Sequence, residues 1–120
     1  MEENEKEETL PLVENPYGLP EFMYFMLISV LRPKTATEIS GDVLEYSIGR
    51  IELNFAEVLT NWCLLQNKGW VDSLPSEDKV KRKCVITKRG LKALDEEIAR
   101  YRRLYELGKI FYEENTRPKE

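Results

Sequence analysis

The sequence predicts a mainly α-helical protein with a small β-hairpin, arranged as a winged helix-turn-helix with a long C-terminal dimerisation helix. One observation is an amphipathic segment, residues 54–68, which opens on Asn54 and ends at Gly69. A basic pair of β-type segments follows within residues 70–87, and a long amphipathic helix starts directly afterwards. A helix, a charged hairpin and a return helix in this order are typical of a winged-helix nucleic-acid binder.

Length and composition narrow the class of protein. The 120 residues fit one domain with a single modest core. No run of about 18 apolar residues is present, and the acidic N-terminus lacks the basic start of a signal peptide. Two cysteines without metal-ligand spacing, Cys63 and Cys84, predict reduced thiols and a cytoplasmic location. The sequence contains no histidine, the commonest general base, so we do not expect an enzyme.

The formal net charge of −4 is divided unevenly along the chain. Residues 1–21 carry −6 and residues 22–78 carry −4, whereas residues 79–103 hold ten bases and three acids. The positive charge therefore falls on the hairpin and the start of the last helix, where a DNA-binding wing needs it. The acidic balance of the whole chain does not exclude a nucleic-acid partner.

Residues 1–16 are rich in glutamate and are predicted to form an acidic, disordered arm. The alternative is an arm that packs on the body through Leu10, Leu12 and Val13.

The first helix should begin near Pro20 and stop at about Leu31, before Pro33. Its middle, residues 22–28, is apolar on every face, which is typical of a helix that is buried all round. A domain of this size offers little interior for such a helix. We therefore expect this helix to pack against a second subunit in a homodimer.

Two shorter helices should follow. The second begins at Thr35 or Thr37 and ends near Tyr46, with a threonine as N-cap. Residues 47–50 form a turn, and residues 51–53 add a short extended segment before Asn54 caps the third helix. Apolar positions at three- and four-residue steps predict the buried faces of these helices. They are Ile39, Val43, Leu44 and Tyr46 in the second helix, and Phe55, Val58, Leu59, Trp62, Leu65 and Gln66 in the third.

The hairpin should consist of strands at residues 70–74 and 80–86 around a turn-rich tip at residues 75–79. Thr87 then caps the last helix, which runs to about Glu114 and leaves residues 115–120 as a frayed tail. The chain thus divides into a winged-helix domain over residues 17–87 and a dimerisation helix over residues 88–114.

The last helix carries a seam of apolar residues that step by three and four, as in a coiled coil. Together with the first helix, this seam predicts a dimer interface that contains Phe22, Phe25, Met26, Leu94, Ile98, Tyr101 and Tyr105.

Over about residues 19–112 the sequence resembles the PadR family of winged-helix transcriptional regulators. Residues 31–39 are similar to the family's L-x-x-P-x-x-G-Y-E-I entry to the second helix, and residues 51–59 to its I-x-L-S-P-G-T-L-Y pattern. Leu65, Gly69, Trp70 and Val71 match L-x-x-x-G-L/W-I, and residues 81–90 match R-K-Y-Y-x-L-T-x-x-G. The resemblance implies a dimer built from the N- and C-terminal helices, operator DNA as partner, and no metal or cofactor. Some members bind small hydrophobic effectors at the dimer interface, so it also allows for such an effector here.

The expected DNA contacts lie on the third helix, on the hairpin and at the start of the second helix. Groove-reading helices present polar or basic side chains to bases and phosphates, and a basic wing meets flanking phosphates. The candidates are Lys34, Thr35, Thr60, Asn61, Lys68, Lys79, Lys81, Arg82 and Lys83.

The third helix departs from the family where it should enter the groove. Ala56, Glu57, Val58 and Leu59 replace the family's Gly-Thr-Leu-Tyr, and Cys63 and Leu64 replace two positions that are commonly basic. A negative charge and a single cation on this helix weaken the attraction to phosphates. If Cys63 and Leu64 are exposed, they favour an alternative function, a winged-helix protein-interaction module with a degenerate DNA-binding surface. If they pack beneath the first helix, they have only a structural role.

Overall fold

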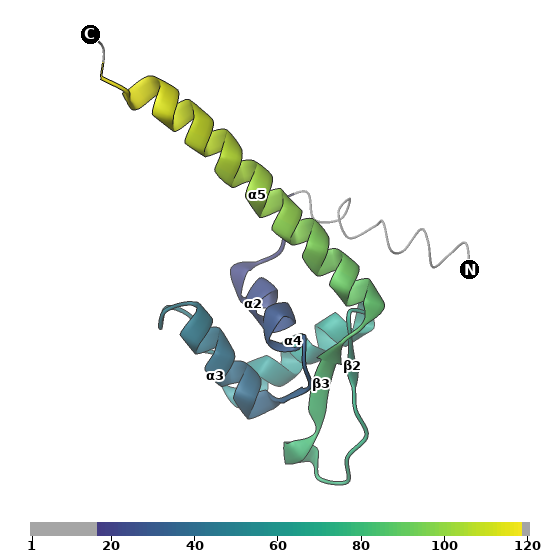
Figure 1. The fold of residues 1–120 in the computed structure, drawn as a ribbon. Coiled ribbons are helices and arrows are strands. Elements are labelled where there is room, and N and C mark those ends of the chain that lie inside the picture. Colours follow the sequence, from purple (N-terminus) through teal and green to yellow (C-terminus); the bar gives the residue numbers. More distant parts are fainter. Residues whose placement is uncertain (1–16, 119–120) are drawn as a thin grey trace, which may run out of the picture.

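The computed structural model describes residues 17–118, and within them the protein is mainly helical with a small antiparallel sheet. The elements in order are α2 (Glu21–Ser29), β1 (Lys34–Thr35), α3 (Ala36–Tyr46), α4 (Phe55–Asn67), β2 (Val71–Ser73), the short 3₁₀-helix η1 (Lys79–Lys81), β3 (Lys83–Ile86) and α5 (Lys88–Thr116). Figure 1 shows α2, α3 and α4 grouped beside the sheet, while α5 runs out from the group. The arm predicted for residues 1–16 lies outside the described residues, as do residues 119 and 120.

Helix α2 is buried within the single chain, packed against α3 and α5. Met26 and Leu27 are 0% exposed, and Phe22 and Phe25 are half-buried against the core. Neighbouring helices of the same chain thus cover much of α2, so the burial of this helix does not by itself require the second subunit that its apolar pattern led us to expect. Met26, expected at a dimer interface, has no surface left for a partner. Dimerisation remains a prediction that rests on α5.

Two capping boxes start α3 and α4. The Thr35 hydroxyl accepts a hydrogen bond from the Glu38 amide at 3.2 Å, and the Glu38 carboxylate accepts one from the Thr35 amide at 2.9 Å. Asn54 and Glu57 form the same reciprocal pair at the start of α4, at 2.8 and 2.9 Å. These pairs satisfy backbone N–H groups that the first helical turn leaves free, so both helix starts are well defined.

The buried stripes of α3 and α4 are narrower than predicted. Leu44 and Tyr46 are each 38% exposed, Phe55 is 47% exposed and Gln66 is exposed. These side chains lie at the margin of each stripe or in the first turn, where packed neighbours on one side of the helix do not reach them. The predicted core positions that are buried are Ile39, Val43, Val58, Trp62 and Leu65.

The sheet has three antiparallel strands in the order β1-β3-β2. Ser73 and Lys34 both lie opposite Cys84, one on each side of the central strand. The predicted hairpin is thus confirmed as β2 and β3. The third strand of the sheet is β1, and residues 51–53 form no strand. Strand β3 is shorter than predicted because the Asp78 carboxylate accepts a hydrogen bond from the Val80 amide at 2.9 Å and caps the turn η1.

The first half of α5 packs on the body and the second half projects from it (Figure 1). Leu94, expected at the dimer interface, is 4% exposed and belongs to the core of the single chain. Ile98 is 40% exposed, Tyr101 packs edge-on against Tyr24 at 4.9 Å between ring centroids, and Tyr105 is 66% exposed. From residue 102 to the end of the described chain every residue is exposed.

The helix continues past the predicted end at Glu114. The Asn115 side chain donates to the Phe111 carbonyl at 2.8 Å, and the Thr116 hydroxyl donates to the Tyr112 carbonyl at 2.6 Å. Both are local contacts in the last turn of α5, which ends at Thr116. None of the helices within residues 17–118 is both long and apolar enough to cross a membrane.

Candidate nucleic-acid interface

Helix α4 and the β2–β3 hairpin lie side by side and form the candidate surface (Figure 1). The inward side of α4 carries Val58, Trp62 and Leu65, which are at most 3% exposed. Its outward side therefore carries Thr60, Cys63, Leu64 and Asn67, which are all exposed. This arrangement follows from the helical repeat, since residues three and four apart share a face.

The Glu57 side chain has a local role that the sequence analysis did not assign to it. Its carboxylate belongs to the capping box with Asn54. The backbone carbonyl of Glu57 accepts a hydrogen bond from the Asn61 side chain at 2.8 Å. Asn61 is half-buried and already donates to the helix backbone, whereas Thr60 is exposed and has no such bond among the described residues. The signal for the capping box was present in the sequence, as an Asn followed three residues later by a Glu.

Three exposed lysines lie at the tip of the hairpin: Lys79 and Lys81 on η1, and Lys83 at the start of β3. We call them the tip lysines. Glu77 and Asp78 are exposed at the same tip, so its charge is mixed. Arg100, which contributed to the positive charge of residues 79–103, is paired with Glu97 on α5 and does not join this cluster.

Arg82 differs from the tip lysines because its guanidinium lies over an aromatic ring. Its central carbon is 5.5 Å from the centroid of the Trp62 ring, and the side chain is half-buried. The Trp62 indole in turn donates to the Ser73 hydroxyl at 2.9 Å. This contact with the ring restricts the Arg82 side chain, and the tip lysines make no such ring contact among the described residues.

The predicted contacts at the start of the second helix are already engaged within the chain. The Lys34 ammonium lies 2.5 Å from Asp42, which also accepts a hydrogen bond from the Ser29 hydroxyl at 2.8 Å. The hydrogen bond to Asp42 raises the pKa of Lys34 above its ordinary value and outweighs the opposing effect of burial. The Thr35 hydroxyl caps α3. Both residues therefore stabilise the junction of β1 and α3, and phosphate binding would require Lys34 to leave Asp42.

Lys68 ends α4 and is turned toward the body. Its ammonium lies 5.2 Å from the centroid of the Trp70 ring, and the residue is half-buried. None of the residues of α4 from Phe55 to Asn67 is basic. Because Lys68 is turned inward, the exposed face of α4 has no cation of its own.

The two cysteines have opposite environments. Cys63 is exposed on the outward side of α4, whereas Cys84 is 1% exposed in the centre of the sheet. Burial, reinforced by the charge of Asp72, raises the pKa of the Cys84 thiol to about 12, so this thiol stays protonated. Leu64 is 46% exposed. The alternative in which Cys63 and Leu64 pack beneath the first helix is therefore wrong.

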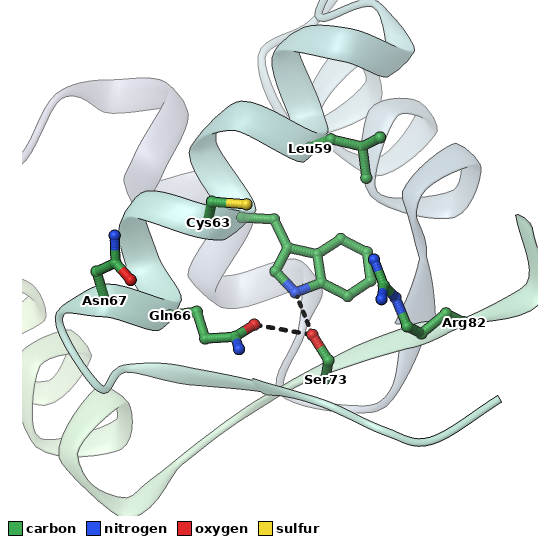
Figure 2. A pocket seen from close by; sticks show the side chains of 7 residues that line it. Leu59, Cys63, Gln66, Asn67, Ser73 and Arg82 are labelled. Atoms are coloured by element: carbon green, nitrogen blue, oxygen red, sulfur yellow. Dashed lines mark hydrogen bonds between the residues drawn. The ribbon is translucent and has the colours of Figure 1, made fainter. Parts of the chain in front are cut away.

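A cleft of about 310 Å³ separates α4 from the hairpin, and we call it the α4–hairpin cleft (Figure 2). Trp62, Ser73 and Gln66 are joined by two hydrogen bonds across its floor. Its lining residues are Leu59, Trp62, Cys63, Gln66, Asn67, Ser73 and Arg82. Gln66 was predicted to be buried, and none of Gln66, Asn67 and Ser73 was among the predicted contacts, because their convergence depends on how the hairpin lies across α4 and leaves no local pattern. Within residues 17–118, no group of three His, Cys, Asp or Glu side chains is placed to hold a metal ion.

Comparison with known protein-family models found no match to this chain, and a search of curated proteins found no significantly similar sequence.

Proposed function

We propose that the protein is a winged-helix DNA-binding regulator of PadR type. In this proposal α4 enters the major groove, the β2–β3 hairpin is the wing, and the tip lysines contact the flanking phosphates. The observation that carries the proposal is the position of these lysines, which are exposed on a hairpin that packs beside the outward face of α4.

The distribution of charge indicates that α4 and the β2–β3 hairpin contribute differently to DNA binding. The outward face of α4 offers Thr60 to base edges but no cation, and Asn61 would have to give up its hydrogen bond to the Glu57 backbone carbonyl to join it. Phosphate contacts supply most of the affinity of DNA-binding proteins, and each one adds to the salt dependence of binding. The electrostatic part of the affinity must therefore come mainly from Lys79, Lys81 and Lys83 on the hairpin.

The proposal includes a homodimer formed through the projecting half of α5. Leu104 is 52% exposed, Leu107 57% and Phe111 56%, and with Tyr105 and Tyr112 they continue the stripe that Leu94 and Tyr101 begin on the body. A long helix with so wide an apolar face is normally covered by a partner. A second copy would also place two α4 helices for successive major grooves, about 34 Å apart.

Charge reversal of the tip lysines tests DNA binding. The K79E/K81E/K83E variant should bind genomic fragments at least about 100-fold more weakly at low salt, because each phosphate contact that is lost removes counterion release. The matched control is R102E/R103E/K109E, which changes the net charge equally but on the exposed surface of α5. Fluorescence anisotropy over a range of salt concentrations measures both variants. A wild-type chain that binds no fragment even at low salt would contradict the proposal. Equal losses of DNA affinity in both variants would exclude the hairpin as the element that contacts the phosphates.

Sedimentation equilibrium tests the dimer. Phe111→Asp should convert a wild-type dimer to monomers without unfolding, because Phe111 makes no contribution to the core of the single chain. Lys109→Asp, a neighbouring exposed substitution on α5, should leave the dimer intact. A dimer that survives Phe111→Asp unchanged would refute this interface.

A protein-interaction module is the second candidate function. Cys63 and Leu64 are exposed side by side on α4 at positions where a groove-reading helix would carry basic residues. An exposed apolar side chain there is better suited to another protein surface than to a phosphate. The DNA-binding assay separates the two functions, since only the first predicts salt-dependent binding that is lost with the tip lysines.

A further inference from the structure

We infer that the α4–hairpin cleft binds a phosphate group, with the guanidinium of Arg82 as its central donor and the side-chain amides of Gln66 and Asn67 beside it. The inference rests on the proposed function for the source of that phosphate, the backbone of the bound DNA. The chemistry of the cleft applies equally to free phosphate.

The contact of Arg82 with Trp62 leaves the N–H groups of the guanidinium without a hydrogen-bond partner among the described residues. The central carbon of the guanidinium lies over the Trp62 ring, 5.5 Å from its centroid, and a planar guanidinium carries its N–H groups around its edge rather than on its faces. No side-chain hydrogen bond of Arg82 is present within residues 17–118, and its Nε is shielded from water without an acceptor. An arginine that is held in place but has no acceptor favours an oxyanion at its edge, where paired N–H groups match two oxygens.

The hydrogen bonds on the floor of the cleft determine which part of Gln66 remains available. The Trp62 indole donates to Ser73 at 2.9 Å, and the Ser73 hydroxyl donates to the Gln66 Oε1 at 2.8 Å. This chain occupies the acceptor oxygen of Gln66 and leaves its amide N–H groups for a ligand (Figure 2). Asn67, at the last turn of α4, adds a second side-chain amide to the cleft.

The charge of the lining points to an anion. No carboxylate is among the residues that line the cleft, and its one charged side chain is Arg82. Asp72 is adjacent to Ser73 in β2, but side chains alternate along a strand, so it faces away from the cleft. Leu59, the Trp62 ring and Cys63 supply the apolar part of the lining, and Arg82, Gln66 and Asn67 supply its side-chain N–H groups.

Salt-dependent DNA binding tests the contribution of the cleft. Arg82→Gln should weaken binding about tenfold or more and reduce the salt slope by about one, the loss expected for one phosphate contact. Arg82→Lys, which keeps the charge but loses the planar fork, should restore the slope and part of the affinity. Arg102→Gln, on the exposed surface of α5, is the matched control and should bind like the wild type.

Gln66→Glu is the sharper variant. The new carboxylate still accepts the hydrogen bond from Ser73, so the fold is preserved, but it replaces the donor by a negative charge. Phosphate binding in the cleft should then be lost. The probe is inorganic phosphate, titrated into the wild type and this variant while ¹H–¹⁵N NMR follows the Trp62 indole, the Gln66 amide and the Arg82 Nε–H.

The two arms distinguish the possible outcomes. Wild-type signals that shift with inorganic phosphate, and do not shift in Gln66→Glu, support the cleft even if no DNA binds, in which case only the proposed function fails. Signals that shift with duplex DNA alone, together with the loss in Arg82→Gln, support a site for the DNA backbone. DNA binding that leaves these signals and the Arg82→Gln affinity unchanged overturns the inference and leaves the proposed function standing. If the protein binds neither inorganic phosphate nor duplex DNA, both the inference and the proposed function are overturned.

Discussion

Replacing Gly90 by alanine should destabilise the folded chain by about 3 kcal/mol, the upper part of the range for an overpacked interior. A Cβ atom at Gly90 would lie 2.1 Å from the Trp70 carbonyl oxygen and 2.7 Å from the Ile86 Cγ1. The oxygen belongs to the backbone and accepts a hydrogen bond from the Thr87 amide at 2.9 Å, so it cannot move without separating α5 from β2. Thermal unfolding should report a drop of at least about 12 °C.

Gly41→Ala is the matched control for this substitution. Gly41 also lies within a helix, α3, but it is exposed and a Cβ there meets nothing within 4 Å. Alanine should therefore stabilise the protein by about 0.5–1 kcal/mol through its helix propensity. If Gly90→Ala unfolds at the same temperature as the wild type, the close approach of α5 to β2 does not exist in solution.

Glu97→Ala should cost about 2–3 kcal/mol, since it removes one partner of a largely buried ion pair. Glu97 is 3% exposed and accepts hydrogen bonds from the Leu19 amide at 2.9 Å and from two nitrogens of Arg100 at 3.1 and 2.9 Å. Without the carboxylate, the segment before α2 loses its attachment to α5. Glu106→Ala, an exposed substitution on the same helix, should change the free energy of unfolding by less than about 0.5 kcal/mol.

The same carboxylate gives the stability a pH dependence of known sign. Burial acts to raise the pKa of Glu97, but the hydrogen bonds from Arg100 and Leu19 outweigh it and hold this pKa below the ordinary value of 4.5. A lowered pKa stabilises the fold above pH 4.5, and this contribution disappears as the pH falls through the folded-state pKa. The free energy of unfolding, measured with urea from pH 6 downward, should therefore decline less steeply with falling pH in Glu97→Ala than in the wild type. Parallel curves would contradict this role.

Local signals in the sequence predicted the helices and the hairpin well. Asn54, Gly69 and Thr87 each mark an element boundary through chemistry contained within a few residues, and all three lie at the boundaries of the structure. Strand β1 has only two residues, too few to show alternation, and forms only because Lys34 and Thr35 lie beside β3.

The errors concern contacts between elements that are distant in the sequence. An apolar pattern shows that α2 must be buried, but it does not say by which partner, and the chain's own α3 and α5 prove sufficient. Likewise, Lys34 resembled a free cation until the fold brought Asp42 to it. The candidate site was predicted where exposure follows from local pattern, as for the tip lysines. It was missed in the α4–hairpin cleft, where three elements converge.

The capping box at the start of α4 affects how this helix can approach a polyanion. The free N–H groups of a helix start, together with the positive end of its dipole, form a ready site for a phosphate. In this protein the Glu57 carboxylate already occupies that end as a built-in anion. A nucleic-acid backbone arriving end-on would meet like charge. In the proposed complex with DNA, α4 would therefore lie lengthwise along the groove, and the hairpin rather than the start of α4 would make the electrostatic contacts.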